Sequence, residues 1–212
     1  MDKIINNYKA LEENLRNLSC ENINQYDLNK TGLFIVDMNN GFAKEGALYS
    51  PRVENIISPI ADFAKDLSGK INNIVAFTDT HEKDAVELKN YPTHCLKGDK
   101  ESQIVDELLP IENMQILEKN STNGFFAMDI ERYKNLDNFI VVGCCTDICV
   151  YQFVLTLKTY FNQNNLDKNI IVPMNLVETY DINGLHPADL LNTIFLNSMI
   201  QNGVKVVKEI VI

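Results

Sequence analysis

Short apolar segments of strand length, recurring between stretches of helical periodicity, constrain the fold of this 212-residue chain more than any other feature. The segments lack the polar alternation of half-exposed strands, which is typical of strands buried on both faces. We expect strands at 32–38, 73–78, 114–118, 139–143, 169–174 and 204–207, and helices near 53–67, 101–109, 146–162 and 187–201. This alternation predicts an α/β fold, a three-layer α/β/α sandwich with a six-stranded, mostly parallel sheet.

The first 30 residues precede this alternation and carry a different pattern. Apolar residues from Ile4 to Leu18 recur at helical spacing, and a polar segment, 21–30, follows them. We therefore expect an N-terminal helical extension and linker over residues 1–30, and a single domain over residues 31–212. The helix is expected to pack against the sheet layers or a second subunit, and we expect a homo-oligomer.

The charge balance and the cysteine content exclude several classes of protein. Nineteen Lys and Arg residues against 29 Asp and Glu residues give a net charge of −10, so no basic face is available for nucleic acid. No apolar run approaches the ~20 residues of a membrane span, and the N-terminus has no apolar signal segment. Five unevenly spaced cysteines make a poor disulfide framework. We expect a cytoplasmic protein with neither a nucleic-acid nor a membrane partner.

Polar residues follow four of the predicted strands at the point where each strand ends. Asp37 ends the first, Asp79 follows the second, Lys119 follows the third, and the turn 143–149 follows the fourth. Ligands of open α/β sheets bind beyond the carboxyl ends of the strands. If the strands are parallel, these residues converge in one cleft.

Asp37 and Lys119 each allow two interpretations. Asp37 interrupts an apolar strand, so it is either a carboxylate that caps the following turn or a buried general base whose pKa is tuned by a neighbour. Lys119 could be that neighbour, although a lysine after a strand is commonly a solvated loop residue.

The turn 143–149 carries three of the five cysteines. Gly143 permits a sharp turn, Thr146 or Asp147 could cap the next helix, and Cys149 then falls in its first turn. The free N–H groups and dipole of a helix start favour a thiolate nucleophile. The alternative is that the cysteines are small buried hydrophobes, which fits Cys144 best. Cys149, Asp37 and Lys119 would together supply nucleophile, base and cation.

Two of the three histidines, His81 and His94, follow Asp79 in the sequence. Asp79 and His81 point to the same side of an extended segment, and His94 could join them from the following loop. Three such ligands leave room for water or substrate on a metal. The alternative is a pair of surface histidines, and His186 is expected to be structural.

Three segments together resemble the isochorismatase-like cysteine hydrolases, in their nicotinamidase/pyrazinamidase branch. IVDMNNGF places Asp37 at the catalytic aspartate, KNSTNGF places Lys119 at the catalytic lysine, and VVGCCTDICV places Cys149 at the nucleophile. The resemblance runs from about residue 32 to residue 207. It implies the isochorismatase-like hydrolase fold and conversion of nicotinamide to nicotinate and ammonia, through a thioester, in NAD salvage.

The resemblance also implies roles for the remaining positions of the site. The oxyanion hole would be formed by the backbone N–H groups of Cys145 and Cys149, with a cis peptide bond between Cys144 and Cys145. The ligands of a divalent metal, most simply Zn²⁺ with Fe²⁺ or Mn²⁺ as alternatives, map to Asp79, His81 and His94. The substrate-binding positions map to Phe42, Tyr91 and Asn39.

This chain departs from the usual pattern of the family at several positions. Asn39 stands where glutamine is usual, Thr80 and Glu82 replace the tryptophan and proline around the metal motif, and Tyr91 replaces a tryptophan. These departures leave three alternatives open: a hydrolase of another small amide or ureido compound, a catalytically silent binding or scaffold member, and a redox sensor built on the clustered cysteines.

Overall fold

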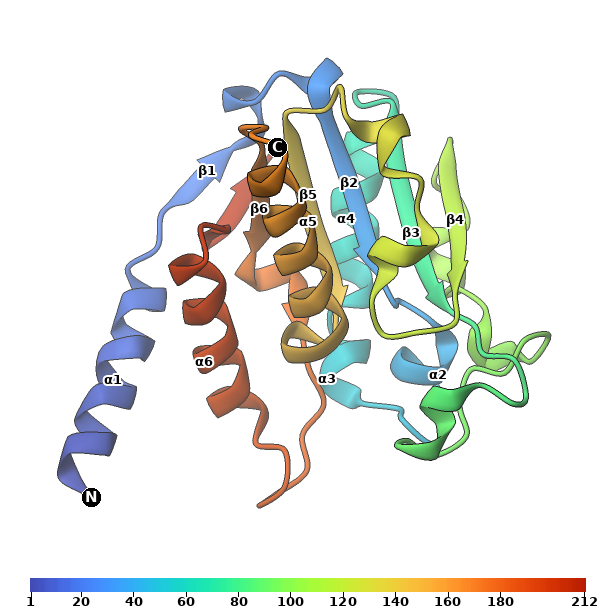
Figure 1. The fold of residues 1–212 in the computed structure, drawn as a ribbon, viewed down its shortest axis with the longest axis horizontal. Coiled ribbons are helices and arrows are strands. Elements are labelled where there is room, and N and C mark those ends of the chain that lie inside the picture. The colour runs from blue at the N-terminus through green and yellow to red at the C-terminus, as the bar shows by residue number, and fades with distance from the viewer.

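The six expected strands lie in one parallel sheet. In the computed structural model, which describes residues 1–212, the order across the sheet is β4-β3-β2-β5-β6-β8 (Figure 1). The strands are β2 (Thr31–Val36), β3 (Asn73–Asp79), β4 (Met114–Lys119), β5 (Asn138–Cys144), β6 (Asn169–Pro173) and β8 (Lys205–Val207). A two-residue strand, β7 (Val177–Glu178), pairs with the end of β5 and makes the sheet seven-stranded. Every pairing in this sheet is parallel, which confirms the predicted fold class.

Helices cover both faces of the sheet. The shorter helices α2 (Asn40–Ala43) and α3 (Pro51–Glu54) precede α4 (Ile57–Leu67), which covers one face, while α5 (Tyr151–Gln163) and α6 (Ala188–Gln201) cover the other (Figure 1). Successive residues of β2 enter different cores: Leu33 packs with the α4 side and Phe34 with the α5 side. Both faces of the strand are therefore buried, which explains its uninterrupted apolar sequence.

The segment 101–109 was expected to be a helix, and this prediction was wrong. It contains only two short 3₁₀ turns, η4 (Lys100–Ser102) and η5 (Asp106–Leu108). Between them the backbone runs beside the residues that follow β2: Val105 N–H donates to the Met38 carbonyl, and Ile104 bridges Asn39. Its apolar residues do reach the core, but this pairing holds the chain extended.

Two other predicted helices are interrupted. The segment 53–67 divides into α3 and α4, and 146–162 begins with a π-helical turn, η8 (Thr146–Val150), before α5. Other single turns join the remaining elements: η3 (Val86–Lys89), η6 (Gly124–Ala127), η7 (Ile130–Tyr133) and η9 (Met174–Leu176). None of the helices combines the length and the apolar character that a bilayer span needs.

The N-terminal segment forms a helix as expected, but the residues after it are not a simple linker. Helix α1 (Asp2–Arg16) packs on α6, where Leu15 is buried and Asn197 Nδ2 donates to the Leu11 carbonyl (Figure 1). Strand β1 (Cys20–Asn22) then pairs with β9 (Glu209–Val211), and the turns η1 (Ile23–Gln25) and η2 (Leu28–Lys30) follow. Each strand has three residues, which is too short to be seen in the sequence. A homo-oligomer stays a prediction.

The ends of β2 and β5 lie very close together. Gly143 pairs with Val36 and has φ +115°, and a Cβ at this position would lie 2.0 Å from the Val36 carbonyl oxygen. The next residues, Asp37 and Cys144, are joined by a bond from Cys144 Sγ to the Asp37 carbonyl at 3.1 Å. Only glycine fits here, and its absence of a side chain brings Asp37 beside the cysteine turn.

Replacing this glycine should therefore damage the site edge of the sheet. We expect Gly143→Ala to lower the free energy of unfolding by roughly 3 kcal/mol or more, because strain at positive φ adds to a backbone clash. Gly69→Ala is the matched control: Gly69 has φ +79°, but no atom lies within 4 Å of the place its methyl group would take, so its loss should be only about 1–2 kcal/mol. Urea unfolding of both variants measures the difference, and equal losses would contradict the close approach.

Candidate active site and metal centre

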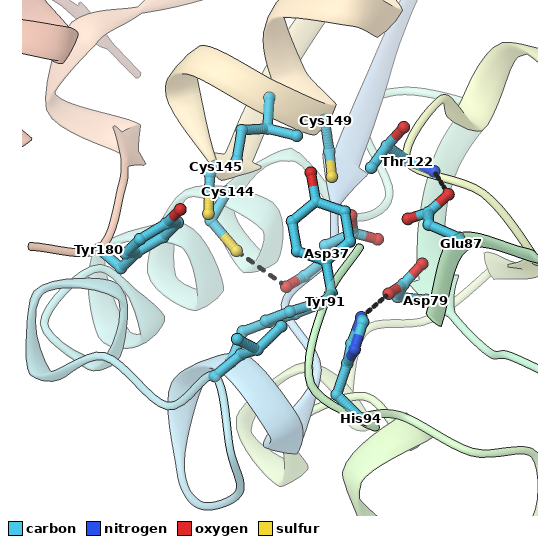
Figure 2. Close-up of a pocket in the computed structure, with 13 residues that line it drawn as sticks. Asp37, Asp79, Glu87, Tyr91, His94, Thr122, Cys144, Cys145, Cys149 and Tyr180 are labelled. Atoms are coloured by element: carbon cyan, nitrogen blue, oxygen red, sulfur yellow. Dashed lines mark hydrogen bonds and ion pairs between the residues drawn. The ribbon is translucent and has the colours of Figure 1, made fainter. Parts of the chain in front are cut away.

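A cavity of about 470 Å³ opens at the carboxyl edge of the sheet, where four strand ends meet. Its wall includes Asp37, Asp79, His94, Cys145 and Cys149, which come from well-separated parts of the sequence (Figure 2). The sequence prediction that these polar residues converge in one cleft is therefore confirmed. The peptide bond between Cys144 and Cys145 is cis, as the resemblance implies.

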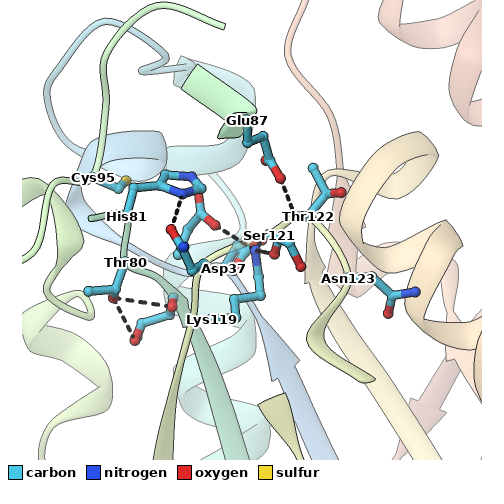
Figure 3. Close-up of polar contacts among 12 residues, drawn as sticks. Asp37, Thr80, His81, Glu87, Cys95, Lys119, Ser121, Thr122 and Asn123 are labelled. Carbon is cyan, nitrogen blue, oxygen red and sulfur yellow. Dashed lines mark hydrogen bonds and ion pairs between the residues drawn. The ribbon is translucent and has the colours of Figure 1, made fainter. Parts of the chain in front are cut away.

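Lys119 lies behind the cavity and joins two carboxylates. Its Nζ is 2.9 Å from Asp37 Oδ2 and 2.7 Å from Asp79 Oδ1, and it donates to the Ser121 carbonyl at 3.0 Å (Figure 3). The Lys119 side chain is 1% exposed, which excludes the alternative of a solvated loop lysine. The two acids hold its pKa well above the ordinary value, despite burial that acts in the opposite direction.

Asp37 is poorly solvated and has few hydrogen-bond donors. Neither of its carboxylate oxygens receives a hydrogen bond of ordinary geometry, so its contact with Lys119 is chiefly an ion pair. Burial raises the pKa of Asp37 to about 7, although Lys119 lowers it and Asp79 adds a smaller increase. The residue does not cap a turn, and its carboxyl can exchange a proton near neutral pH.

Cys149 lies in the η8 turn and is buried beside Asp37, and both residues line the cavity. Burial raises the pKa of the Cys149 thiol well above its ordinary value, and Lys119 offsets only part of this effect. Burial and the neighbouring acids thus act against the thiolate that the helix start was expected to favour. The thiol needs a proton acceptor before it can react.

Asp79, His81 and His94 present ligand atoms to one another within 4.8 Å. His81 Nε2 and His94 Nε2 lie 2.9 Å and 3.1 Å from the same oxygen, Asp79 Oδ2. All three residues are buried, which excludes the alternative of surface histidines. Backbone pairing positions His94. The His81 N–H donates a hydrogen bond to the carbonyl of the next residue, Cys95, and this bond holds the two segments side by side.

The hydrogen bonds of the two rings suit a cation. His94 Nδ1 donates to the Pro92 carbonyl at 2.7 Å, and His81 Nδ1 lies 3.1 Å from Asn120 Oδ1. The Asn120 oxygen also accepts from the Glu82 N–H, which fixes its orientation. A proton on Nδ1 of each ring satisfies these bonds, and a metal would then bind at Nε2, the atom of each ring that faces Asp79. Two imidazole nitrogens beside one carboxylate oxygen form a donor set that fits a divalent metal.

The charge on Asp79 is strongly favoured. Burial raises its pKa, but Lys119 and the two histidines more than offset this effect and hold the pKa far below the ordinary value. Asp79 is thus ionised at neutral pH, which suits a metal ligand.

The structure corrects the assignment of Asn39 to substrate binding. Asn39 is fully buried, and its amide makes bonds only to the backbone: Nδ2 donates to the Asp79 and Ser102 carbonyls, and Oδ1 accepts from the Asp79 N–H. It therefore holds the metal-binding segment in place from behind. Phe42 and Tyr91 do line the cavity, with ring centroids 5.7 Å and 6.1 Å from that of His94.

Sequence reasoning missed several residues of the wall. Glu87 lines the cavity from η3 and accepts a hydrogen bond from the Thr122 N–H at 3.0 Å, and Tyr180 forms the wall beside Cys145 (Figure 2). Tyr180 follows β7, so the rule that ligands bind beyond strand ends could have found it had a strand of two residues been visible. Glu87 lies in an acidic loop segment that carries no such signal.

Comparison with known proteins agrees with this geometry. The isochorismatase domain family matches residues 31–207, which is most of the chain. Nicotinamidase 1 of Arabidopsis thaliana is 29% identical over 210 residues, covering 84% of this chain and 86% of that protein.

Solved structures share the fold. Pyrazinamidase of Pyrococcus horikoshii in complex with zinc has a TM-score of 0.70 and 21% identity, over 84% of this chain and 99% of that one. N-carbamoylsarcosine amidase from Thermoplasma acidophilum has a TM-score of 0.69 and 23% identity, over 84% and 96% of the two chains. The chain therefore belongs to the isochorismatase family, as an amide hydrolase of that family.

Proposed function

We propose that this protein is a metal-assisted cysteine amidohydrolase that converts nicotinamide to nicotinate and ammonia. The observation that carries the proposal is the meeting of Cys149, Asp37 and the Asp79–His81–His94 set around one cavity. Its similarity to nicotinamidase 1 of Arabidopsis thaliana supports the choice of substrate. We place the enzyme in the cytoplasm, in pyridine-nucleotide salvage, with residues 31–212 as the hydrolase domain.

In the first half of the reaction, Asp37 acts as general base and then as general acid. Its carboxylate accepts the thiol proton of Cys149 as the sulfur attacks the amide carbonyl carbon, and a tetrahedral oxyanion forms. When this intermediate collapses, the C–N bond breaks and the amide nitrogen takes the proton from Asp37, leaving as ammonia. The acyl group remains on Cys149 as a thioester.

In the second half, water completes the hydrolysis. Asp37 accepts a proton from a water molecule whose oxygen attacks the thioester carbonyl, and the C–S bond then breaks. The thiolate of Cys149 recovers its proton from Asp37, and the acid product loses its own proton to solvent and leaves as nicotinate. A carboxyl with a pKa of about 7 suits both directions of transfer at neutral pH.

The backbone of the cysteine turn supplies the oxyanion hole in this proposal. The N–H groups of Cys145 and Cys149 lie at the start of a helical segment, where N–H groups lack intrahelical partners. Loss of one such donor costs on the order of 3 kcal/mol of transition-state stabilisation. Lys119 keeps a positive charge beside the base and so opposes the increase in its pKa.

A divalent cation, which we propose to be Zn²⁺, would be held by Asp79, His81 and His94. The zinc complex of the Pyrococcus horikoshii pyrazinamidase supports this identity, and Fe²⁺ or Mn²⁺ suit the same ligands. When bound, the cation supplies a Lewis acid that can accept the ring nitrogen of a pyridine. Phe42 and Tyr91 then form the aromatic walls for the ring.

Two alternatives fit the structure less well. A ureido substrate would use the same acylation chemistry, and N-carbamoylsarcosine amidase has a similar fold. Such a substrate would, however, leave the aromatic walls and the proposed metal beside them without a role. A silent binding member would keep Asp37, Asp79 and Lys119 buried at a considerable desolvation cost with no chemistry to require it.

Replacing the nucleophile tests the proposal directly. We expect Cys149→Ala to lower the rate of ammonia release from nicotinamide by on the order of 10⁴-fold or more, since no thioester can form. Cys20→Ala changes an exposed thiol far from the cavity and should keep full activity. A panel of aromatic, aliphatic and ureido amides, assayed with both variants and the wild type, shows which substrate class is preferred; an active Cys149→Ala would refute the mechanism.

The pH dependence follows from Asp37. Its ionised form accepts the thiol proton, and the ionised fraction falls as the pH drops below the pKa of about 7. We therefore expect kcat/KM to decrease about tenfold per pH unit below that value. Circular dichroism at each pH checks that the protein stays folded, and a flat profile from roughly pH 5 to pH 8 would exclude Asp37 as the base.

Removal of a ligand tests the metal centre. His94→Ala should weaken zinc binding by more than roughly 100-fold and raise KM for nicotinamide, because a nitrogen donor itself is lost, whereas loss of a hydrogen-bond partner of a ligand already costs about 10- to 100-fold. Zinc content by elemental analysis and affinity by titration calorimetry measure this without reliance on activity. Wild-type protein treated with chelator and then resupplied with zinc is the control; undiminished zinc affinity in His94→Ala would contradict the assignment.

A further inference from the structure

Tyr180 separates the site cavity from a larger outer cavity. Both cavities are lined by Leu48, Tyr91 and Tyr180, and the outer one, of about 1260 Å³, continues past Tyr49 and Arg52. Figure 2 shows Tyr180 on the cysteine side of the site, across from His94 and Asp79. The three shared side chains therefore form a partition between the space beside Cys149 and the open outer cavity.

A buried acidic residue in the nucleophile turn holds the segment that carries Tyr180. Asp147 lies in η8, two positions before Cys149, and uses both carboxylate oxygens. Thr179 Oγ1 donates to Asp147 Oδ1 at 2.6 Å, and His186 Nε2 lies 2.9 Å from Asp147 Oδ2. This contact replaces the helix-capping role that the sequence suggested for Asp147, since no side chain caps the turn.

His186 in turn fixes both the backbone and the ring of Tyr180. Its Nδ1 lies 2.9 Å from the Tyr180 carbonyl oxygen, and its ring stacks on the Tyr180 ring with centroids 3.7 Å apart and an angle of 18° between the planes. The Asp147 and His186 side chains are only 6% and 14% exposed. Two backbone hydrogen bonds between Ile182 and His186 close the short loop between these two residues. The Tyr180 ring thus cannot leave its position without loss of the stack.

These contacts give His186 a task beyond a general structural one. A stacked ring has few free rotamers, so the wall that Tyr180 forms is rigid rather than adaptable. A rigid wall discriminates by size, because a substrate that overlaps it must displace packed atoms. Asp147 shares a turn with Cys149, so the wall is fixed relative to the nucleophile itself.

We propose that Tyr180 is a specificity-determining residue that sets the upper size limit of the amide substrate, with Asp147 and His186 as its positioning residues. The inference rests on the proposed amidase function of the adjoining cavity. This size limit restricts the substrates to small, flat aromatic amides. Amides with a bulky ring substituent would be excluded by the partition, although the outer cavity behind it has room for such a group.

Truncation of the ring tests the size limit. We expect Tyr180→Ala to raise kcat/KM for nicotinamides bearing a propyl or phenyl substituent, relative to unsubstituted nicotinamide, by on the order of tenfold or more. Tyr180→Phe keeps the stacked ring and should keep the wild-type preference. Tyr49→Ala is the matched control, because Tyr49 lines only the outer cavity. The inference is wrong if Tyr180→Ala and Tyr49→Ala show the same size preference as the wild type.

A double-mutant comparison tests the positioning residues. His186→Ala should relax the size limit in the wild-type background but add nothing in the Tyr180→Ala background, because it acts through the Tyr180 ring. His186→Phe retains a stacking partner and should restore part of the limit. Thermal unfolding identifies general destabilisation, which would appear in both backgrounds; full additivity of the effects on size preference would refute a role through Tyr180.

The outcomes for the two proposals are distinguishable. If wild-type protein fails to hydrolyse nicotinamide, the proposed substrate is wrong, and the size series is built instead on the amide of the panel with the highest turnover. If the wild type hydrolyses its substrate and the relative kcat/KM values do not respond to Tyr180→Ala, only the specificity inference fails. Affinities of the same compounds for Cys149→Ala and Cys149→Ala/Tyr180→Ala, measured by calorimetry, give a readout independent of turnover.

Discussion

One buried ammonium, that of Lys119, joins the two acidic residues around which the site is built. It contacts Asp37 at 2.9 Å and Asp79 at 2.7 Å, yet the two carboxyls respond differently. Asp79 has two histidine neighbours besides Lys119, so its charge is strongly stabilised. Asp37 has little beyond the ion pair to offset burial, and its pKa rises to about 7. Beside the same cation, one acid is therefore ionised at neutral pH and the other is able to exchange protons.

This charge group depends on the register of the sheet. Asp79 and Lys119 are opposite one another at the ends of β3 and β4, and Asp37 follows the neighbouring strand β2. Burial of three charged groups is costly, and removal of one partner from such a group costs about 3–5 kcal/mol, because the others stay buried and unpaired. Asn39 adds support by bonding the Asp79 backbone from within the protein. The chemistry and the stability of this sheet edge are thus difficult to alter separately.

The sequence predicted the parts of this arrangement that follow from strand ends. The apolar runs located six strands, and the edge rule then placed Asp37, Asp79 and Lys119 together. The sequence could not predict the pKa of the Cys149 thiol, because this pKa depends on burial and on two acidic residues that are distant in sequence. The helix expected at 101–109 is absent, because its apolar spacing suits equally well an extended segment paired with the residues that follow β2. Asn39 was assigned the wrong role and Tyr180 was missed, because the contacts of both residues are set by tertiary packing.

The turn η8 links two polar groups that serve different ends. On one side Cys149 faces Asp37 and Lys119, and on the other Asp147 binds Thr179 and His186. The first group consists of buried charged residues, and substitution of any of them is costly. The second group holds the loop that carries Tyr180, whose ring forms part of the cavity wall. Substitutions in the segment 177–187 can therefore alter the size of the cavity without moving the proton-transferring groups. In the mechanism we propose, substrate selection by Tyr180 and catalysis by Cys149 would depend on different residues of one turn, so that the acylation chemistry can be kept while the substrates change.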